Sequence, residues 1–278
     1  ILLRRALVMP KLSIDGLEMH VCVKGPEDGP AVEMLHGLGS CADDWELNTP
    51  ALADRYRVVA VDLRGHGRSA KPRDGYGVPR FAADVLGVMD AMGIGRAHVV
   101  GLSMGGMVAF ELGANHGERL RSMTIVNSIP AMSIPNLRVG AMLMQWYLAT
   151  FLAPMDRLGR LLARGMFPKP SQQPLRDEFE RRFRMNERRP YRAAGRSLLG
   201  WSVVPKLGEI ACPSLIVSGD RDFFPLAFKR EAAAIIPDCE LVMVEDSGHV
   251  TPIDQAEAFN RRLCEFLAGV DANRGHGT

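Results

Sequence analysis

The sequence predicts an α/β protein in which helices cover both faces of a mostly parallel sheet. Short strand-like segments alternate with helical segments over much of the chain. The strand-like runs 58–61 and 124–126 are almost wholly apolar, as strands buried on both faces require. In the helical segment 78–92, apolar residues recur every three or four positions, which is the spacing of one helix face.

The composition excludes several classes of function. The chain has 278 residues, enough for one large α/β domain with an insertion. Its net charge of +2 is too small to indicate nucleic-acid binding, and no nucleic-acid-binding motif is present. The five cysteines are scattered without a Cys-x-x-Cys pair, which argues against a disulfide framework or a zinc site and is typical of a reducing compartment.

We expect neither a signal peptide nor a membrane span. The apolar run at the start of the chain is short and is followed by two arginines. Met9 is an alternative start, so the origin of residues 1–8 stays open. The most apolar stretch, 141–154, is shorter than a membrane-spanning helix. The expectation is a cytoplasmic, soluble protein with no membrane partner.

The first part of the chain is expected to form a hairpin and then alternating strands and helices. Asp15-Gly16 lies between the strand-like runs 12–14 and 17–23, and such a pair is a strong hairpin signal. The elements that follow are a strand, a short helix, a strand and a longer helix, at 31–35, 47–53, 57–62 and 78–92. A Gly-rich turn follows each of the two strands, so both turns lie at strand ends.

The segment Gly101-Leu102-Ser103-Met104-Gly105 fits Gly-x-Ser-x-Gly, the turn that carries the nucleophile of many serine hydrolases. A strand at 97–100 should lead into it and a helix at 104–115 should lead out. That turn holds the serine in a strained conformation with its hydroxyl exposed, and the flanking glycines let strand and helix approach closely. Taken alone, the motif also fits an ordinary strand-to-helix turn.

The pattern changes after the next expected strand, 122–127. From about residue 129 to 205, prolines separate helical segments that we expect at 138–150, 155–166, 175–187 and 191–201. Strands then return at 214–218 and 241–244, with a helix at 226–236 between them. Thr251 is expected to cap a last helix that ends near 268, and residues 271–278 to form a frayed tail.

A serine nucleophile needs a base, and the base needs an acid that orients it. In an open α/β sheet such groups lie on loops beyond the carboxyl ends of the strands. The loop after strand 214–218 carries Asp220 and Asp222, and the loop after strand 241–244 carries His249. The order along the chain is therefore serine, aspartate, histidine.

With these segments in place, the chain from about 12 to 268 resembles the α/β-hydrolase superfamily. Four segments carry the resemblance: HGLG, DLRGHGRS, the Ser103 pentapeptide and SGH, at 36–39, 62–69, 101–105 and 247–249. Capped esterases, enol-lactonases and cofactor-free haloperoxidase-like hydrolases are the members it is most similar to. The resemblance implies an eight-stranded, mostly parallel sheet flanked by helices, with an inserted helical cap. It divides the chain into a core of 9–128 and 206–270 and a cap of 129–205.

The resemblance also implies a role for each member of the triad. Ser103 is the nucleophile and His249 the general base and acid. Asp222 is the acid that orients His249, because it matches the family's Gly-x-x-Asp pattern from Gly219. Asp220, next to that glycine, stays open as the alternative acid.

Two backbone N–H groups are expected to form the oxyanion hole, which binds the negative oxygen that develops during acyl transfer. The first belongs to Met104, the residue after the nucleophile. The second, by resemblance, belongs to Leu38 in the loop after strand 31–35. The sequence shows no dinucleotide or phosphate-binding motif and no metal-ligand cluster, so we expect neither a cofactor nor a metal.

The expected cap is rich in arginine, at positions 176, 181, 182, 184, 188, 189, 192 and 196. Because acidic residues are interleaved with them, a solvated helix held by ion pairs is the first interpretation. The alternative is that one arginine faces the pocket and binds a substrate carboxylate. An apolar stripe at 142–151 is expected to pack the cap on the core or to line an acyl pocket.

The sequence therefore predicts a carboxylesterase-type serine hydrolase that acts on a small-molecule ester through an acyl-enzyme. Enol-lactonases and carbon–carbon bond hydrolases share every residue named so far and remain alternatives. A hydrolase fold kept only as a binding module is a third hypothesis, disfavoured because all three triad residues are present. The natural substrate and the oligomeric state, a homo-oligomer included, stay open.

Overall fold

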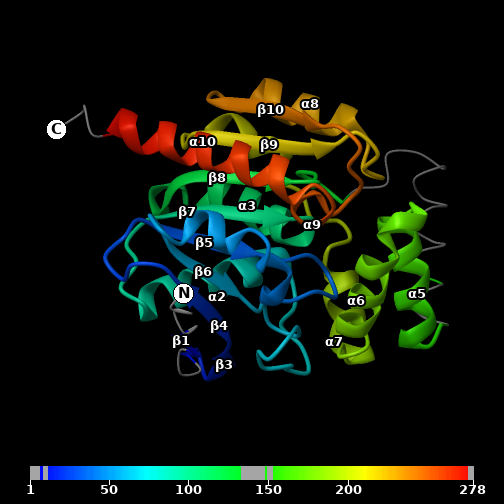
Figure 1. The fold of residues 1–278 in the computed structure, drawn as a ribbon. Coiled ribbons are helices and arrows are strands. Elements are labelled where there is room, and N and C mark those ends of the chain that lie inside the picture. The colour runs from blue at the N-terminus through cyan, green and yellow to red at the C-terminus, as the bar shows by residue number, and fades with distance from the viewer. Residues whose placement is uncertain (1–6, 9–11, 133–147, 149–152, 275–278) are drawn as a thin grey trace, which may run out of the picture.

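The computed structural model describes residues 7–8, 12–132, 148 and 153–274, and they form a sheet with helices on both faces (Figure 1). The eight strands of the sheet are β1 (Leu7–Val8), β4 (Val21–Lys24), β5 (Ala31–Leu35), β6 (Arg57–Val61), β7 (Ala97–Leu102), β8 (Leu120–Val126), β9 (Ser214–Gly219) and β10 (Cys239–Val244). The pairings of β4 with β1 and β6 are antiparallel, and the remaining pairings are parallel. The predicted eight-stranded, mostly parallel sheet is therefore confirmed.

The strand order creates a crevice in the middle of the sheet. Across the sheet the order is β1-β4-β6-β5-β7-β8-β9-β10. The chain runs from β5 to β6 on one side and then returns to β7 on the other side of β5. In such sheets the loops after the two central strands separate to opposite sides, which leaves room for a ligand at their carboxyl ends.

The start of the chain differs from the sequence prediction in two respects. The hairpin at Asp15-Gly16 forms, but its strands β2 (Leu12–Ile14) and β3 (Leu17–Met19) make a separate two-stranded sheet. The run expected as one strand is interrupted at His20, whose N–H donates to Ser69 Oγ (2.8 Å), and only β4 joins the main sheet. In addition, β1 pairs with β4 before residue 9, where we expected the core to begin.

Helices of the two faces enclose separate apolar cores. On one face lie α2 (Val78–Ala91), α3 (Met104–Asn115) and α8 (Leu226–Ile235), and on the other lie η1 (Ala42–Trp45), α1 (Thr49–Leu52) and α10 (Ala256–Arg274). The face of α10 that contains Phe259, Leu263 and Leu267 is buried against the sheet. Burial on both sides explains why the central strands are apolar without alternation.

The end of the chain is more ordered than expected. The last helix is divided at Gln255 into α9 (Thr251–Asp254) and α10, and Thr251 is the first residue of α9 rather than its cap. The predicted frayed tail is wrong up to residue 274, because α10 continues through Asp271. The Asp271 carboxylate accepts hydrogen bonds from Tyr56 Oη (3.1 Å) and His98 Nε2 (3.2 Å), which tie the helix to the sheet.

The helices expected between 129 and 205 lie together at one end of the sheet (Figure 1). They are α5 (Met155–Met166), α6 (Gln173–Phe183) and α7 (Arg188–Ser197), with short 3₁₀ turns η3 (Pro170–Gln172) and η4 (Val204–Glu209). A further 3₁₀ turn, η2 (Gly117–Arg119), precedes β8. Leu158, Phe183 and Tyr191 form a small apolar core between α5, α6 and α7. The helix expected at 138–150 and most of the stripe at 142–151 lie outside the described residues, and the division at 129 and 205 stays a prediction. Among the helices described, none combines the length and the apolar character that crossing a bilayer requires.

A carboxyl group without a partner lies inside the sheet. Glu33, in the middle of β5, is fully buried, and neither of its carboxyl oxygens has a hydrogen-bond partner among the described residues. Burial raises the pKa of Glu33 from 4.5 to about 8, and the charge of Arg57 offsets only part of this effect. The Glu33 carboxyl is therefore mostly protonated, and so uncharged, at pH 7.

We expect the Glu33→Gln variant to be more stable than the wild type at pH 8 and equally stable near pH 4.5. The unfolded chain releases this proton near pH 4.5, whereas the folded protein holds it up to about pH 8. The wild type therefore loses up to about 1.4 kcal/mol of stability per pH unit across this range, and glutamine does not ionise. Melting temperatures from pH 4.5 to 8.5 test this, with the exposed Glu245→Gln as the control. A difference between E33Q and wild type that is independent of pH would contradict it.

Candidate active site

Ser103 lies on a tight turn between β7 and α3 at the central crevice. Its backbone is in the left-handed region (φ 53°, ψ −113°), a conformation that a non-glycine residue rarely adopts. A Cβ atom on Gly101 would lie 2.1 Å from the carbonyl oxygen of Gly105, and one on Gly105 would lie 2.2 Å from that of Leu35. The two glycines therefore allow the backbone contact between strand and helix, as the motif predicts.

The structure brings the side chains of Ser103, His249 and Asp222 into one hydrogen-bonded row. His249 Nε2 lies 2.8 Å from Ser103 Oγ, and His249 Nδ1 lies 2.6 Å from Asp222 Oδ1. Because an ionised carboxylate can only accept, Nδ1 carries the ring proton and Nε2 accepts from the serine hydroxyl. Asp220, the alternative acid, instead accepts a hydrogen bond from the backbone N–H of Ser247 (2.9 Å).

Asp222 has a second hydrogen-bond donor, the Lys229 ammonium, that the sequence did not suggest. Lys229 Nζ, on α8, donates to Asp222 Oδ2 and also to Ser218 Oγ at 2.8 Å. The Lys229 and Asp222 side chains are 0% and 1% exposed. Burial by itself would raise the pKa of Asp222, but His249 and Lys229 outweigh it and hold the pKa below its ordinary value. No sequence signal marks Lys229, because a lysine in a helical segment is usually solvated.

Asn127 joins the loop that carries Asp222 to the loop that carries His249. Its Oδ1 accepts from the Gly219 N–H (2.8 Å), and its Nδ2 donates to the carbonyls of Gly248 (3.1 Å) and His249 (2.8 Å). The same Nδ2 lies 2.8 Å from Thr251 Oγ1, so that hydroxyl is used here and not as a helix cap. Like Ser103, Asn127 has a positive φ (45°), and its fully buried side chain reaches both loops from the end of β8.

Asp246 and Asp254, the acidic neighbours of His249 in sequence, do not contact the imidazole in the described structure. Asp254 accepts hydrogen bonds from Ser247 Oγ (2.8 Å) and the Gly248 N–H (2.6 Å), so it holds the loop from the far side. Asp246 is exposed and pairs with Lys169 and Arg221. Asp254 therefore holds the loop of His249, and of the aspartates considered as its partner only Asp222 contacts the imidazole in the described structure.

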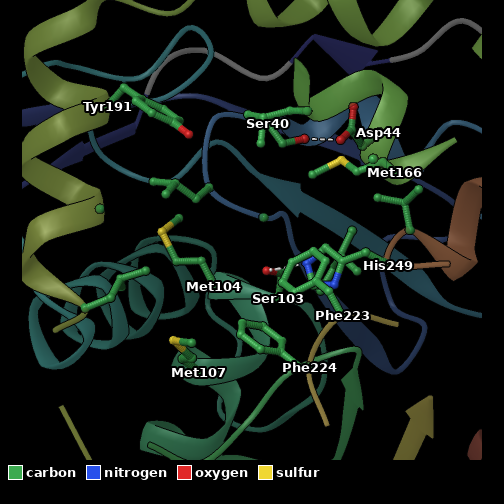
Figure 2. Close-up of a pocket in the computed structure, with 18 of the residues that line it drawn as sticks. Ser40, Asp44, Ser103, Met104, Met107, Met166, Tyr191, Phe223, Phe224 and His249 are labelled. Carbon is green, nitrogen blue, oxygen red and sulfur yellow. Dashed lines mark hydrogen bonds between the residues drawn. The ribbon is translucent and has the colours of Figure 1, made fainter. Parts of the chain in front are cut away.

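Ser103 and His249 open into a cavity of about 390 Å³ (Figure 2), a size typical of sites for small molecules. Apart from these two residues, the polar side chains that line it, among the residues that the structure describes, are those of Ser40, Asp44 and Tyr191. The other lining side chains are apolar and come from both the sheet loops and the helices α5 to α7. Leu161 and Leu199, both exposed, are among them.

The residues predicted for the oxyanion hole also line this cavity. Met104 is the first residue of α3, so its N–H has no acceptor within the helix. Leu38 lies in the turn after β5, and a Cβ on the adjacent Gly37 would be 3.5 Å from Ser103 Cβ. The turn and the helix start therefore both lie against Ser103. Whether the two N–H groups bind an oxyanion stays a prediction.

Two aromatic residues beside the triad were not found from the sequence. The Phe223 ring stacks on the imidazole of His249 with the ring centres 3.9 Å apart, and Phe224 meets it edge-on at 5.5 Å. Phe223 is 53% exposed, and both residues line the cavity. The sequence signal that could have revealed them is their position directly after Asp222, because residues next to a triad member lie on the same loop and near the same cavity.

The predicted turn residues near the site serve as its frame. His36 Nε2 accepts from the Leu63 N–H (3.0 Å), so Nδ1 carries the proton and donates to the Gly37 carbonyl (2.7 Å). Burial lowers the pKa of His36, which keeps this arrangement neutral. In the 62–69 turn, Asp62 accepts from the N–H groups of Ala42 (2.7 Å) and Arg68 (2.8 Å). His36 and Asp62 therefore hold backbone, and neither is among the described residues that line the cavity.

No arginine is among the described residues that line the cavity. Arg182 meets the cavity wall indirectly: its Nη1 donates to the cavity residue Asp44 (3.2 Å), while its Nη2 and Nε bond to Glu46 and Glu178. Arg181 also pairs with Glu178, which agrees with the interpretation of a helix held by ion pairs. In the described ranges no group of histidine, cysteine and acidic side chains has the arrangement of a metal site.

Comparison with known proteins identifies the family of this chain. The family model for the alpha/beta hydrolase fold matches residues 30–256, which is most of the chain and includes all three side chains of the row. The chain belongs to the α/β-hydrolase family. Hydrolytic activity is therefore the expected class of function for this member.

Relatives with different named activities cover nearly the whole chain. "Putative carbamate hydrolase RutD" of Variovorax paradoxus is 31% identical over 269 residues, covering 92% of this chain and 98% of the relative. "3-Oxoadipate enol-lactonase 1" of Acinetobacter baylyi is 28% identical and covers 92% and 95%. The crystal structure of the enol-lactonase from Burkholderia xenovorans LB400 superposes with a TM-score of 0.86 at 26% identity, covering 93% of this chain and 100% of that one.

We expect Gly105→Ala to destabilise the protein by about 1–3 kcal/mol or more, because its Cβ would overlap the Leu35 carbonyl. A backbone neighbour cannot rotate away as a side chain can. Gly117→Ala is the matched control, since nothing lies within 4 Å of its Cβ and its φ is not positive. Urea denaturation of both variants measures the difference. Equal midpoints for G105A and G117A would show that the contact tolerates a methyl group.

Proposed function

We propose that the protein is a serine hydrolase that cleaves carboxylic esters through an acyl-enzyme. The observation that carries the proposal is the row Ser103–His249–Asp222 at the wall of a largely apolar cavity. A hydroxyl, an imidazole and a buried carboxylate in this order have the geometry of nucleophile, base and orienting acid.

In this mechanism His249 Nε2 takes the proton of Ser103 as Oγ attacks the ester carbonyl. The alcohol then leaves with that proton, and the acyl group stays on Oγ. Water attacks the acyl-enzyme through the same base and releases the acid. Asp222 keeps the ring proton on Nδ1 and stabilises the imidazolium that forms.

The negative oxygen of each tetrahedral intermediate is bound by the N–H groups of Met104 and Leu38. Support for this assignment comes from the position of both residues against Ser103 at the cavity wall. The start of α3 adds the positive end of a helix dipole at the same point. Such donors are fixed before the reaction and need no rearrangement, which is why they lower the barrier.

A second candidate is lactone hydrolysis, since ring opening uses the same steps and a relative is named as an enol-lactonase. A lactone that carries a carboxylate is disfavoured here, because Asp44 and not an arginine lies at the described cavity wall. A binding module without catalysis would keep the cavity but not need an activated serine. A fluorophosphonate probe distinguishes either hydrolase from a binding module, because it reacts only with an activated serine.

We expect Ser103→Ala to lose at least about 10³-fold in kcat/KM on p-nitrophenyl esters and to lose fluorophosphonate labelling. The fold should be retained, because the substitution removes a single hydroxyl group, which hydrogen-bonds to His249. Esters from acetate to dodecanoate, assayed with wild type and variant side by side, measure this. Unchanged turnover by S103A would refute the proposed nucleophile. Labelling without ester turnover would instead direct the search to lactones.

Replacement of Lys229 tests how Asp222 acts. In the wild type, the Asp222 charge is divided between His249 and Lys229. We expect Lys229→Met to move the acidic limb of the kcat/KM–pH profile to higher pH, because loss of the lysine charge raises the pKa of the Asp222 carboxyl, which must be ionised to orient His249. Ser218→Ala removes the other partner of Lys229 but keeps its charge, and should leave the limb unmoved. A change in the height of the profile without a shift would limit Lys229 to a packing role.

A further inference from the structure

We propose that Ser40 and Asp44 form a specificity subsite that binds a hydrogen-bond donor, such as a hydroxyl or ammonium group, on the part of the substrate remote from the scissile ester. The proposal rests on the proposed function, because it names the class of substrate that the same cavity accepts. It concerns a pair of side chains that the chemistry at Ser103 does not use.

Ser40 and Asp44 lie in the same cavity as the triad but come from a different segment. Ser40 follows the turn after β5, Asp44 lies in η1, and both line the cavity with Ser103 and His249. Figure 2 shows Ser40 and Asp44 facing each other across their hydrogen bond, apart from the Ser103–His249 pair. A substrate held at Ser103 can therefore extend toward them.

The hydrogen bonds of this pair leave acceptors and no donor. Ser40 Oγ uses its only proton to donate to Asp44 Oδ2, which leaves the serine lone pairs available. Asp44 Oδ1 accepts from Arg182 Nη1 at 3.2 Å. An ionised carboxylate offers about four acceptor sites, so each oxygen of Asp44 keeps capacity for another donor.

The Asp44 carboxylate is incompletely stabilised by its protein partners. Arg182 does not neutralise Asp44 alone, because the same guanidinium also bonds to Glu46 and Glu178. Burial raises the pKa of Asp44, and the hydrogen bonds from Ser40 and Arg182 oppose this only in part. A donor brought by the substrate would supply a hydrogen bond that the buried carboxylate otherwise lacks.

The surroundings make this pair selective. Apart from Tyr191, the remaining side chains that line the described cavity outside Ser103 and His249 are apolar or glycine. A donor placed elsewhere against them would lose its bonds to water without replacement. A carboxylate or other anion at the same end would meet Asp44 and be repelled, whereas an unsubstituted alkyl end would leave Asp44 without its added donor.

The experiment compares p-nitrophenyl esters of matched acyl chains that end in methyl, hydroxyl, ammonium, methoxy or carboxylate, at four to eight carbons. At the best chain length, the wild type should prefer the hydroxyl or ammonium end over methyl by about tenfold or more in kcat/KM. The carboxylate end should be the poorest substrate. Preference for methoxy, which only accepts, or for no end at any length, would overturn the proposal.

Variants assign the preference to the pair. Asp44→Asn and Ser40→Ala should each reduce the ratio of kcat/KM for the hydroxyl-ended ester to that for the methyl-ended ester. Glu46→Gln is the matched control, because Glu46 shares Arg182 but does not line the cavity, and should keep the ratio. If D44N lowered kcat/KM equally for all ends, the pair would have no role in selection.

Failure of the subsite and failure of the proposed function give different results. Turnover of methyl esters that depends on Ser103, without any end preference, refutes the subsite alone. If no ester is cleaved, calorimetric binding of hexan-1-ol and hexane-1,6-diol to Ser103→Ala and to the same protein with Asp44→Asn still tests it. Tighter binding of the diol that is lost with D44N supports the subsite, and equal binding refutes it.

Discussion

The site depends on a backbone contact that only glycine permits. The end of β7 and the start of α3 touch through Gly101 and Gly105, and the latter also meets the carbonyl of Leu35 at the end of β5. This contact places the strained Ser103 at the crevice of the sheet and brings the first N–H of α3 beside the turn that carries Leu38. The strain at Ser103, on the order of 1–3 kcal/mol, is tolerated because the surrounding strands and helix leave the turn no other path.

The acid and the base reach this serine through a second constraint, the buried amide of Asn127. It bonds to backbone groups of both the Gly219 and the His249 loops, so neither loop is positioned independently of the other. Asp222 then lies between two hydrogen-bond donors, His249 Nδ1 and Lys229 Nζ, in buried surroundings. In such surroundings an unpaired carboxylate would be costly, and the two partners keep it ionised and fixed.

The wall of the cavity is built from two separate parts of the chain. The wall around Ser103 and His249 comes from the loops of the sheet, and much of the apolar wall comes from α5, α6 and α7; the α/β-hydrolase family model spans both parts. Relatives named for carbamate and enol-lactone hydrolysis each cover 92% of the chain, at 31% and 28% identity, so overall similarity does not select a substrate. We infer that selection depends on the few polar groups at the cavity wall, which among the described residues include Asp44 and no arginine.

The sequence by itself determined the fold class, the order of the central strands and helices along the chain, and the Ser103 turn, because two-sided burial and the glycines of the turn leave local patterns in apolar spacing and residue type. The sequence also limited the expected carboxylate partner of His249 to Asp220 or Asp222. The tertiary structure decided between these two, since both follow the same strand and only the approach of the His249 loop distinguishes them. Contacts between segments distant in sequence likewise decided four further features. They are the break at His20, the ordered helix through Asp271, the burial of Lys229 and the direction in which Arg182 points. Such contacts depend on side-chain direction and on which loops meet, and neither quantity has a local signature in the chain.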